Sequence, residues 1–503
     1  MSAVKGWTRR ATLVAGAASV LASAVPARAV PITFSVSAPD GEFHSAGMLE
    51  GDASRAWGFA GIRYATAQRF QPPVPVTNAQ QLPDGFGPAC PQRGSAYLPQ
   101  SEDCLFLNVW RPFGEADPRP VMVYFHGGAY SAGSVTDPVN DGARLAERGD
   151  VVVVTVNHRL NVLGYLYQPD RFPSSGNNGQ LDLICALQWI QRNIAAFGGD
   201  PGNVTVFGQS GGGAKIATLM AMPEAAGLFH KAITMSGQQV TASGPLNASR
   251  RTRAFLARLG EGVDPVTAPV DALLDALAAT DPILGGGVYM GPVLDMLHLS
   301  RHPFWPDAPA QSAAIPMLLG NTVMETRAFY APEGRQLTGL DSGNLAERIA
   351  PEMRIDIQPD WVVEQFRARY PRAGALELFH RIVTAARSWR GQVEEAEARA
   401  RAGAPAAERT WVYQLDFEQA KHTDDIALSF GTVPSPSAAQ QAMSDRIMGV
   451  FVRFARIGDP GWTAYDLDRR MTMVFDAESR EVSDPRAWER ELFARVPYIQ
   501  PGS

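Results

Sequence analysis

A serine placed between glycines is the feature of this sequence with the clearest chemical potential. Residues 208–212 read GQSGG with Ser210 at the centre, and Gly213 follows directly. Glycine in a helix costs roughly 0.5–1 kcal/mol relative to alanine, so three glycines are unexpected where a helix begins. Nevertheless, residues 214–220 favour a helix and residues 203–209 favour a buried strand. This arrangement is typical of a nucleophile elbow, a tight strand-to-helix turn that exposes a serine hydroxyl. The alternative is a plain glycine-rich turn, and the flanking strand and helix favour the elbow.

A second glycine pair can supply the backbone donors that such a serine requires. When a serine attacks a carbonyl group, the charge on the oxygen must be held by N–H groups, which form an oxyanion hole. Residues 126–130 read HGGAY and follow the apolar strand pattern of residues 120–125. We therefore expect the backbone N–H groups of Gly128, Ala129 and Gly211 to form this hole.

A histidine must take the proton of the serine, and four histidines lie well beyond the elbow in the chain. They are His298, His302, His380 and His422. His422 lies in a loop after the strand-like residues 410–417, so we predict that it is the base. His380 lies in an amphipathic helical pattern. His298 and His302 are four residues apart, as zinc ligands can be, but a proline interrupts the stretch and no HExxH motif exists, so we expect no metal site.

A carboxylate must orient the histidine, and in proteins with such an elbow it lies between the serine and the histidine in the chain. Glu325 follows an apolar strand pattern in the stretch MLLGNTVMETRAF. Asp295, in the stretch GPVLDM, is the competing candidate. Spacing alone does not decide between these two residues.

Apolar strand patterns alternate with helical patterns along most of the chain. We expect strands in PVMVYFHGG, DVVVVTVNHR, NVTVFGQS, IPMLLGNT and TWVYQLDF, and helices in ARLAERG and in residues 177–201. Residues 227–237 are expected to form a short helix and then a strand. The alternation predicts an α/β fold with a mainly parallel sheet covered by helices on both faces. Helical insertions at residues 248–279 and 342–401 are expected to cap the site.

The first 29 residues have the composition of an export signal. Lys5, Arg9 and Arg10 precede the apolar run of residues 11–25, and ARA at residues 27–29 supplies small residues for cleavage. The arginine pair resembles a twin-arginine signal, and the apolar run is shorter than the roughly 20 residues that a membrane span needs. We expect a periplasmic or secreted protein without a stable membrane anchor, folded as a single domain over residues 30–503.

The overall charge of the chain argues against a nucleic-acid partner. The 503 residues are 45% hydrophobic and 19% charged, and the formal net charge is −6. Removal of the signal would delete four cations and no acids, which takes the net charge to about −10. Because no basic stripe is present, we expect no nucleic-acid partner.

The three cysteines allow three pairings, between which the sequence alone does not choose. Cys90 and Cys104 flank a loop-like stretch with proline and glycine, whereas Cys185 lies in an apolar helical pattern that favours a buried thiol. We expect a Cys90–Cys104 disulfide, which would close a loop of about 15 residues and add on the order of 3 kcal/mol of stability.

Two long motifs stand out in the sequence, FGGDPGNVTVFGQSGG at residues 197–212 and EDCLFLNVWRP at residues 102–112. They resemble the signatures of the type-B carboxylesterases, the family of bacterial para-nitrobenzyl esterases, animal carboxylesterases and cholinesterases. Further family-like segments are FAGIRYA, FARIGDP and WTAYD, so the similarity runs from about residue 41 to residue 476. The resemblance implies an α/β-hydrolase fold.

The resemblance also implies a role for each candidate residue. It implies Ser210 as nucleophile, Glu325 as acid in preference to Asp295, and His422 as base. It assigns the oxyanion hole to Gly128, Ala129 and Gly211, and it pairs Cys90 with Cys104. This chain departs from the family in having Gln209 where many members have glutamate, and Gly211 where alanine is common. The missing negative charge makes a cationic, choline-like substrate less favourable.

Together these features predict a serine carboxylic-ester hydrolase that acts through an acyl-enzyme on small to medium esters and needs no metal or organic cofactor. One alternative is a lipase that acts on longer lipid esters. Another is a binding protein on the same fold, although relatives of that kind have lost the nucleophile. Candidates for the walls of the pocket are Met324, Phe329, Tyr330 and Trp389.

Overall fold

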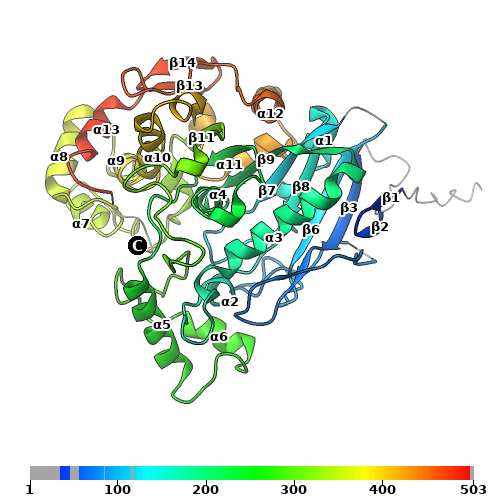
Figure 1. Ribbon diagram of the computed structural model, residues 1–503. Coiled ribbons are helices and arrows are strands. Elements are labelled where there is room, and N and C mark those ends of the chain that lie inside the picture. The colour runs from blue at the N-terminus through cyan, green and yellow to red at the C-terminus, as the bar shows by residue number, and fades with distance from the viewer. Residues whose placement is uncertain (1–33, 46–55, 84, 115–117, 499–503) are drawn as a thin grey trace, which may run out of the picture.

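A ten-stranded sheet crosses the whole molecule (Figure 1). The computed structural model describes residues 34–45, 56–83, 85–114 and 118–498. Across the sheet the strands follow the order β14-β13-β12-β11-β10-β9-β7-β8-β6-β3. Their bounds are β3 (Ala56–Arg63), β6 (Phe106–Pro112), β7 (Arg119–Phe125), β8 (Val152–Val156), β9 (Gly199–Gln209), β10 (Lys231–Met235), β11 (Met317–Thr322), β12 (Thr410–Leu415), β13 (Met471–Phe475) and β14 (Arg480–Ser483). All neighbours from β8 to β13 pair in parallel, and the edges are antiparallel, which confirms the predicted mainly parallel sheet.

The central strands are mainly apolar because both faces of the sheet are covered. In β7, Val121 and Val123 belong to one apolar core, whereas Met122 and Tyr124 belong to a second core on the opposite face. Successive side chains of a strand point to opposite faces. A strand buried on both faces therefore reads as a continuous apolar run, which is the pattern from which it was predicted.

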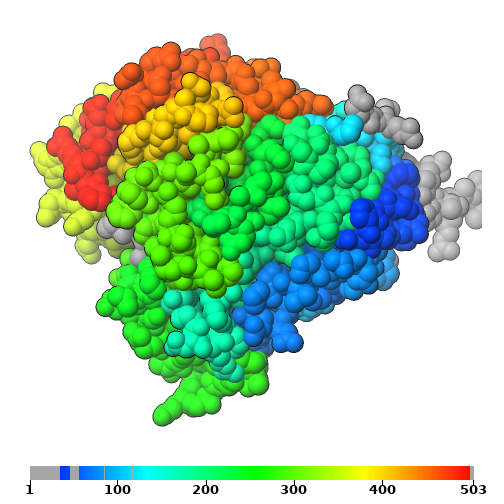
Figure 2. Space-filling model, in the orientation of Figure 1, coloured from blue at the N-terminus to red at the C-terminus, as the bar shows by residue number. Residues whose placement is uncertain are grey.

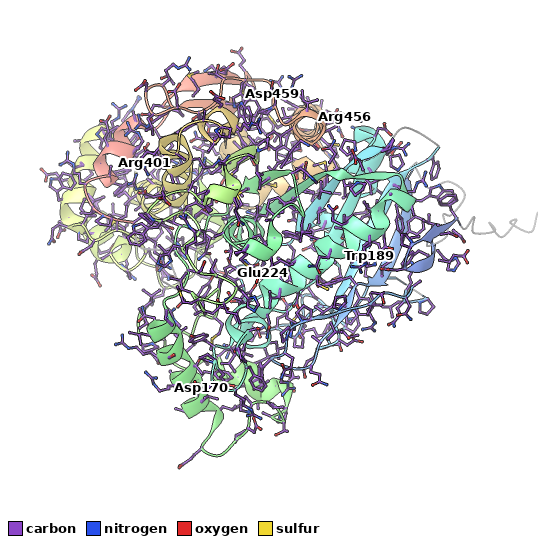
Figure 3. All side chains as sticks on the ribbon, viewed as in Figure 1. Asp170, Trp189, Glu224, Arg401, Arg456 and Asp459 are labelled. Carbon is purple, nitrogen blue, oxygen red and sulfur yellow. The ribbon has the colours of Figure 1, made fainter. Side chains whose placement is uncertain are left out.

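Helices cover both faces of the sheet. The first core is closed by α3 (Asn178–Asn193), α4 (Gly211–Leu219) and α10 (Arg390–Arg401), and α3 lies in front of the sheet in Figure 1 with Trp189, labelled in Figure 3, fully buried. The second core is closed by α1 (Ala143–Gly149), α11 (Asp424–Phe430) and α12 (Ala438–Ile457). The chain thus forms the three-layered α/β architecture expected from the sequence.

The two predicted helical insertions are present. The first contains α5 (Pro245–Leu259) and α6 (Val270–Ala276), which form the lowest part of the molecule in Figure 2. The second contains α7 (Leu345–Ile349), α8 (Pro359–Arg369), α9 (Ala375–Val383) and α10, and α7 to α9 share a third apolar core with α13 (Ala487–Phe493). The first insertion therefore packs into the first core of the sheet, whereas α7 to α9 have a core of their own.

One local prediction is wrong. Residues 227–230, expected to be helical, form turns and bends before β10 begins. Gly227 adopts a left-handed φ of 77°, which ends the preceding turn, and too few residues remain before the strand to form a helix. The predicted export signal, residues 1–29, lies outside the described residues. Within the described part of the chain, none of the helices has the length and hydropathy needed to cross a membrane.

Candidate active site

Five adjacent parallel strands each end in a residue or loop of the candidate site. β7 leads into residues 126–130, β9 into Ser210, β10 into Ser236, β11 into Glu325 and β12 into His422. Because the carboxyl ends of parallel strands meet at one edge of a sheet, residues far apart in the chain come together there. Ser210 follows β9, which lies between β7 and β10 in the sheet. The predicted oxyanion loop is therefore on one side of Ser210, and the predicted acid and base are on the other.

Ser210 occupies a strained backbone conformation, as the elbow predicts. Its φ is 55° and its ψ is −121°, between the end of β9 and the start of α4. Its N–H group donates to the carbonyl oxygen of Met235 at 2.7 Å, and its carbonyl oxygen accepts from the N–H of Ala214 at 3.1 Å. A non-glycine residue in such a region costs on the order of 1–3 kcal/mol and persists only where its surroundings enforce it.

The glycines after the serine allow neighbouring loops to touch the first turn of α4. A Cβ atom on Gly212 would lie 1.9 Å from the carbonyl oxygen of Phe125, and one on Gly211 would lie 2.2 Å from that of Ala129. A Cβ on Gly213 would lie 2.9 Å from the Cα of Gly237. Because no side chain fits at these distances, glycine is required to bring the ends of β7 and β10 against the elbow.

The predicted oxyanion loop lies directly against the elbow. Gly128 and Ala129 have φ values of 81° and 54°, and the carbonyl oxygen of Gly128 accepts from the N–H groups of Ser131 and Ala132 at 3.1 and 3.0 Å. The approach of Ala129 to Gly211 brings all three predicted donor residues together. Backbone contacts therefore contribute to the conformation of this loop.

The predicted acid and base meet in a buried hydrogen bond. Oε2 of Glu325 lies 2.5 Å from Nδ1 of His422, and the N–H of His422 also donates to the carbonyl oxygen of Glu325 at 3.3 Å. Oε1 of Glu325 accepts from the hydroxyl of Ser236 at 2.6 Å and from the N–H of Thr322 at 2.7 Å. The fully buried carboxylate therefore has partners on both oxygens, as a buried charge requires.

Asp295, the competing acid, has a different place. Its Oδ1 accepts from the N–H groups of residues 297, 298 and 299 at 3.1, 2.9 and 2.9 Å, and its Oδ2 accepts from the side-chain amide of Asn177 at 2.8 Å. It caps a loop and does not contact His422. The geometry thus separates two candidates that chain spacing left open.

The second nitrogen of the imidazole faces the elbow. Nε2 of His422 lies 3.2 Å from the side-chain nitrogen of Gln209, the residue before Ser210. Among the described residues, the Ser210 hydroxyl makes no hydrogen bond with His422. Catalytic hydrogen bonds are often long before substrate binds.

Of the four candidate wall residues, one lies exposed beside the base. The ring centroid of Phe329 lies 4.7 Å from that of His422, and this side chain is 38% exposed. Met324, Tyr330 and Trp389 are buried and belong to the packing of the fold. Phe329 is therefore the wall candidate that a substrate could touch.

Three polar residues of this region were not predicted from the sequence. Ser236 holds the acid, and Lys215 of α4 donates to two carbonyl oxygens of the oxyanion loop. Asp425, three residues after the base, accepts from the hydroxyl of Tyr413 at 3.4 Å, and burial, followed by the nearby charge of Glu325, raises its pKa to about 7. Ser236 could have been found because it directly follows a predicted strand next to the elbow strand.

The other histidines lie in structural contacts. His298 joins Glu224, labelled in Figure 3, at 2.8 Å and the Ser174 hydroxyl at 2.9 Å. His302 accepts from the N–H of Ala242, and the buried His380 contacts the hydroxyl of Thr326. Within the described ranges, no cluster of three or more histidine, cysteine or acidic side chains is arranged to hold a metal ion.

The predicted disulfide is not formed in the structure. Cys90 and Cys104 are buried free thiols, as is Cys185. A hydrogen bond with Cys90, together with burial, raises the pKa of the Cys104 thiol well above its ordinary value, so the two sulfur groups are neighbours. The structure therefore brings together the pair that the sequence favoured, without a bond between the two sulfur atoms.

Comparisons with known proteins agree with this geometry. A model of the carboxylesterase family matches residues 43–482. The para-nitrobenzyl esterase of Bacillus subtilis (strain 168) is 33% identical over 479 residues, covering 86% of this chain and 93% of that protein. A probable N-octanoylanthranilate hydrolase of Rhodococcus erythropolis is 35% identical over 366 residues, covering 68% of this chain and 78% of that protein.

Solved structures show the same relationship. The crystal structure of a carboxylesterase from Geobacillus stearothermophilus has a TM-score of 0.79 to this chain at 32% sequence identity, covering 91% of this chain and 99% of its own. A structure of a para-nitrobenzyl esterase has a TM-score of 0.75 at 31% identity, with the same coverage. The chain belongs to the carboxylesterase family, has the α/β-hydrolase fold and is a carboxylic ester hydrolase.

Proposed function

We propose that this enzyme hydrolyses small to medium carboxylic esters through an acyl-enzyme on Ser210, with His422 as base and Glu325 as the acid that orients it. The observation that carries the proposal is the 2.5 Å bond between Glu325 and His422, with the strained elbow at the other side of the imidazole. Such a constellation is recognised by its geometry and not by its position in the chain.

In this mechanism each group acts at a defined atom. Nε2 of His422 removes the proton of the Ser210 hydroxyl, which attacks the ester carbonyl carbon. The N–H groups of Gly128, Ala129 and Gly211 hold the negative charge that develops on the carbonyl oxygen. The proton then passes to the leaving alcohol, and a water molecule activated by the same histidine releases the acid. The carboxylate of Glu325 balances the charge of the imidazolium.

The direct test of the nucleophile is Ser210→Ala, measured with p-nitrophenyl butyrate. We expect kcat to fall by at least about 10⁴-fold with folding retained, because the acyl-enzyme cannot form. A variant that keeps near-native turnover would exclude Ser210 as nucleophile.

The range of substrates is tested with p-nitrophenyl esters of increasing acyl length. A simple esterase is expected to prefer short and medium chains in solution and to show no jump in rate as a long ester passes its solubility limit. A jump in rate there would favour the lipase alternative. Absence of both turnover and labelling by a fluorophosphonate would favour the binding-protein alternative.

We also propose that the protein is exported and that Cys90 and Cys104 are joined in the exported form. The composition of residues 1–29 and the contact between the two buried thiols support this proposal. Disulfides persist in oxidising compartments. Intact mass of the mature protein, measured with and without reduction and alkylation, would show one disulfide and Cys185 as a free thiol. Two further alkylated cysteines without reduction would contradict it.

A further inference from the structure

A buried lysine lies behind the oxyanion loop. Lys215 is the fifth residue after Ser210, in a helix whose other members are glycine, alanine, threonine and aliphatic residues, and its side chain is 0% exposed. Lysine is almost never fully buried, because removing an ammonium group from water is costly. A lysine at this position therefore needs partners that compensate for its burial.

The partners of this lysine are backbone oxygens of the oxyanion loop. Nζ of Lys215 donates to the carbonyl oxygen of His126 at 3.0 Å and to that of Ala129 at 2.9 Å. These two carbonyl groups bracket Gly127 and Gly128, which have no side chains of their own to fix them. One amine thus ties together both ends of the segment that carries two of the proposed oxyanion donors.

No salt bridge within the described residues accounts for Lys215. The groups that face it are the His126 ring and the Tyr130 ring from the loop after β7, with Nζ 5.6 Å from the centroid of Tyr130, and His158 from the end of β8. Burial, and then the charge of Lys215, lowers the pKa of His126 to about 3 and that of His158 well below its ordinary value, so both rings are neutral. From α3, Gln180 donates to the backbone carbonyl of the lysine at 3.3 Å.

We propose that Lys215 is a positioning residue for ester hydrolysis, which holds the His126–Ala129 segment so that the N–H groups of Gly128 and Ala129 face the reacting carbonyl. This inference rests on the proposed function, since it assumes that these groups form the oxyanion hole. Oxyanion donors act because they are fixed before the charge develops. A flexible glycine segment would lose that advantage.

The close approach of the loop to α4 fits this role. The carbonyl oxygen of Ala129, which accepts from Lys215, is the atom that a Cβ on Gly211 would meet at 2.2 Å. Gly211 thus makes room for an oxygen that Lys215 holds in place. Burial lowers the pKa of Lys215 to about 7. A neutral amine still has two N–H donors, so both hydrogen bonds can persist when the ammonium loses its proton.

The test is Lys215→Met, which keeps an unbranched apolar side chain and removes both donors. The matched control is Lys231→Met. Lys231 is also buried, but its amine bonds the side chain of Asn203. Lys231 is the first residue of β10 and so lies at the end of that strand opposite Ser236. Active sites are counted by end-point labelling with a fluorophosphonate. We then measure kcat and KM per labelled site with p-nitrophenyl butyrate, together with the inhibition constant of an alkyl trifluoromethyl ketone, which forms a tetrahedral oxyanion adduct.

We expect Lys215→Met to lower kcat per labelled site by about 10- to 100-fold with KM changed less than threefold, because a misplaced donor loop weakens binding only of the charged intermediate. Affinity for the trifluoromethyl ketone should fall by a similar factor, and Lys231→Met should change neither value. A merely structural role would lower the melting temperature or the labelled fraction and leave kcat per labelled site intact. A kcat and a ketone affinity within twofold of the wild type would overturn the inference.

A second variant keeps the test decisive if Lys215→Met does not fold. Lys215→Gln retains a neutral donor on a shorter side chain, so its kcat per labelled site should fall by less than about tenfold but by more than twofold; an unchanged value would overturn the inference. Failure of the proposed function would give a different result from failure of this inference. In that case the wild type would not be labelled at Ser210, and Ser210→Ala would not lower turnover.

Discussion

The two halves of the active site are built in different ways. On the acid–base half, Glu325, His422 and Ser236 are joined by side-chain hydrogen bonds of 2.5 and 2.6 Å. On the oxyanion half, backbone of the β7 loop packs against the glycines of α4, and the Lys215 side chain bonds two carbonyl oxygens of the loop. The first half should therefore fail when a side-chain group is removed. The second should fail when an atom is added to a glycine or when the hydrogen bonds of Lys215 are lost.

The largest effect on the acid–base half is expected from Glu325→Gln. This variant keeps the shape of the side chain but removes the charge that orients and balances His422, so kcat should fall by about 10³-fold. The measurement is turnover of p-nitrophenyl butyrate per folded enzyme. Glu377→Gln, which removes a surface partner of Arg381, is the control and should leave kcat unchanged. A loss of less than tenfold for Glu325→Gln would show that the carboxylate is not part of the mechanism.

The corresponding effect on the oxyanion half is expected from Gly212→Ala. The added methyl group would overlap the carbonyl oxygen of Phe125, and overpacking of this kind lowers the free energy of unfolding by about 3 kcal/mol. The matched control is Gly449→Ala in α12, where a Cβ meets nothing within 4 Å. That change should raise the free energy of unfolding by roughly 0.5–1 kcal/mol. Urea denaturation compares the two, and equal stabilities would contradict the packing argument.

A smaller effect is expected from Ser236→Ala. Without this hydroxyl, Oε1 of Glu325 keeps only the N–H of Thr322, and the carboxylate becomes less well oriented toward His422. A hydrogen bond to a charged group contributes about 1.5 kcal/mol, which corresponds to about tenfold, and we expect kcat to fall by that factor. Ser444→Ala removes a buried hydroxyl that bonds the carbonyl oxygen of Leu428, away from the site, and should leave kcat unchanged. Equal kcat values for both variants would show that Ser236 does not position the acid.

The smallest effect is a pH dependence of stability. Burial lowers the pKa of Lys215 from 10.5 to about 7 in the folded protein. Between these values the unfolded chain binds more protons than the folded protein, so this group makes the free energy of unfolding rise with pH. The wild type should therefore gain about 2 kcal/mol relative to Lys215→Met between pH 7 and pH 9. Parallel stability curves in urea would contradict the lowered pKa.

The sequence predicted the parts of the site that depend on local patterns. The GQSGG turn, the HGGAY loop and the apolar runs of β7 to β12 are local features, and each occupies its predicted place. His422 could be chosen because it follows a strand. The structure brings these residues together because a parallel sheet places the ends of its strands at one edge.

The remaining parts depend on contacts that a single sequence does not encode locally. Glu325 and Asp295 both follow apolar stretches, and only the path of the chain after β11 shows which one reaches His422. Lys215 is one polar residue in an apolar helix, and its meaning depends on a loop that begins 89 residues earlier. The helix expected at residues 227–230 does not form, because Gly227 has a left-handed φ that ends the preceding turn.

The most direct test of the whole account is the site and rate of labelling by a fluorophosphonate. Peptide mass spectrometry of the wild type should show one label, on Ser210, and the label should be absent from Ser210→Ala. His422→Ala should slow the labelling by at least about 10³-fold, because the hydroxyl then lacks its base. A label on any other residue, or labelling of His422→Ala at the wild-type rate, would contradict the proposed arrangement.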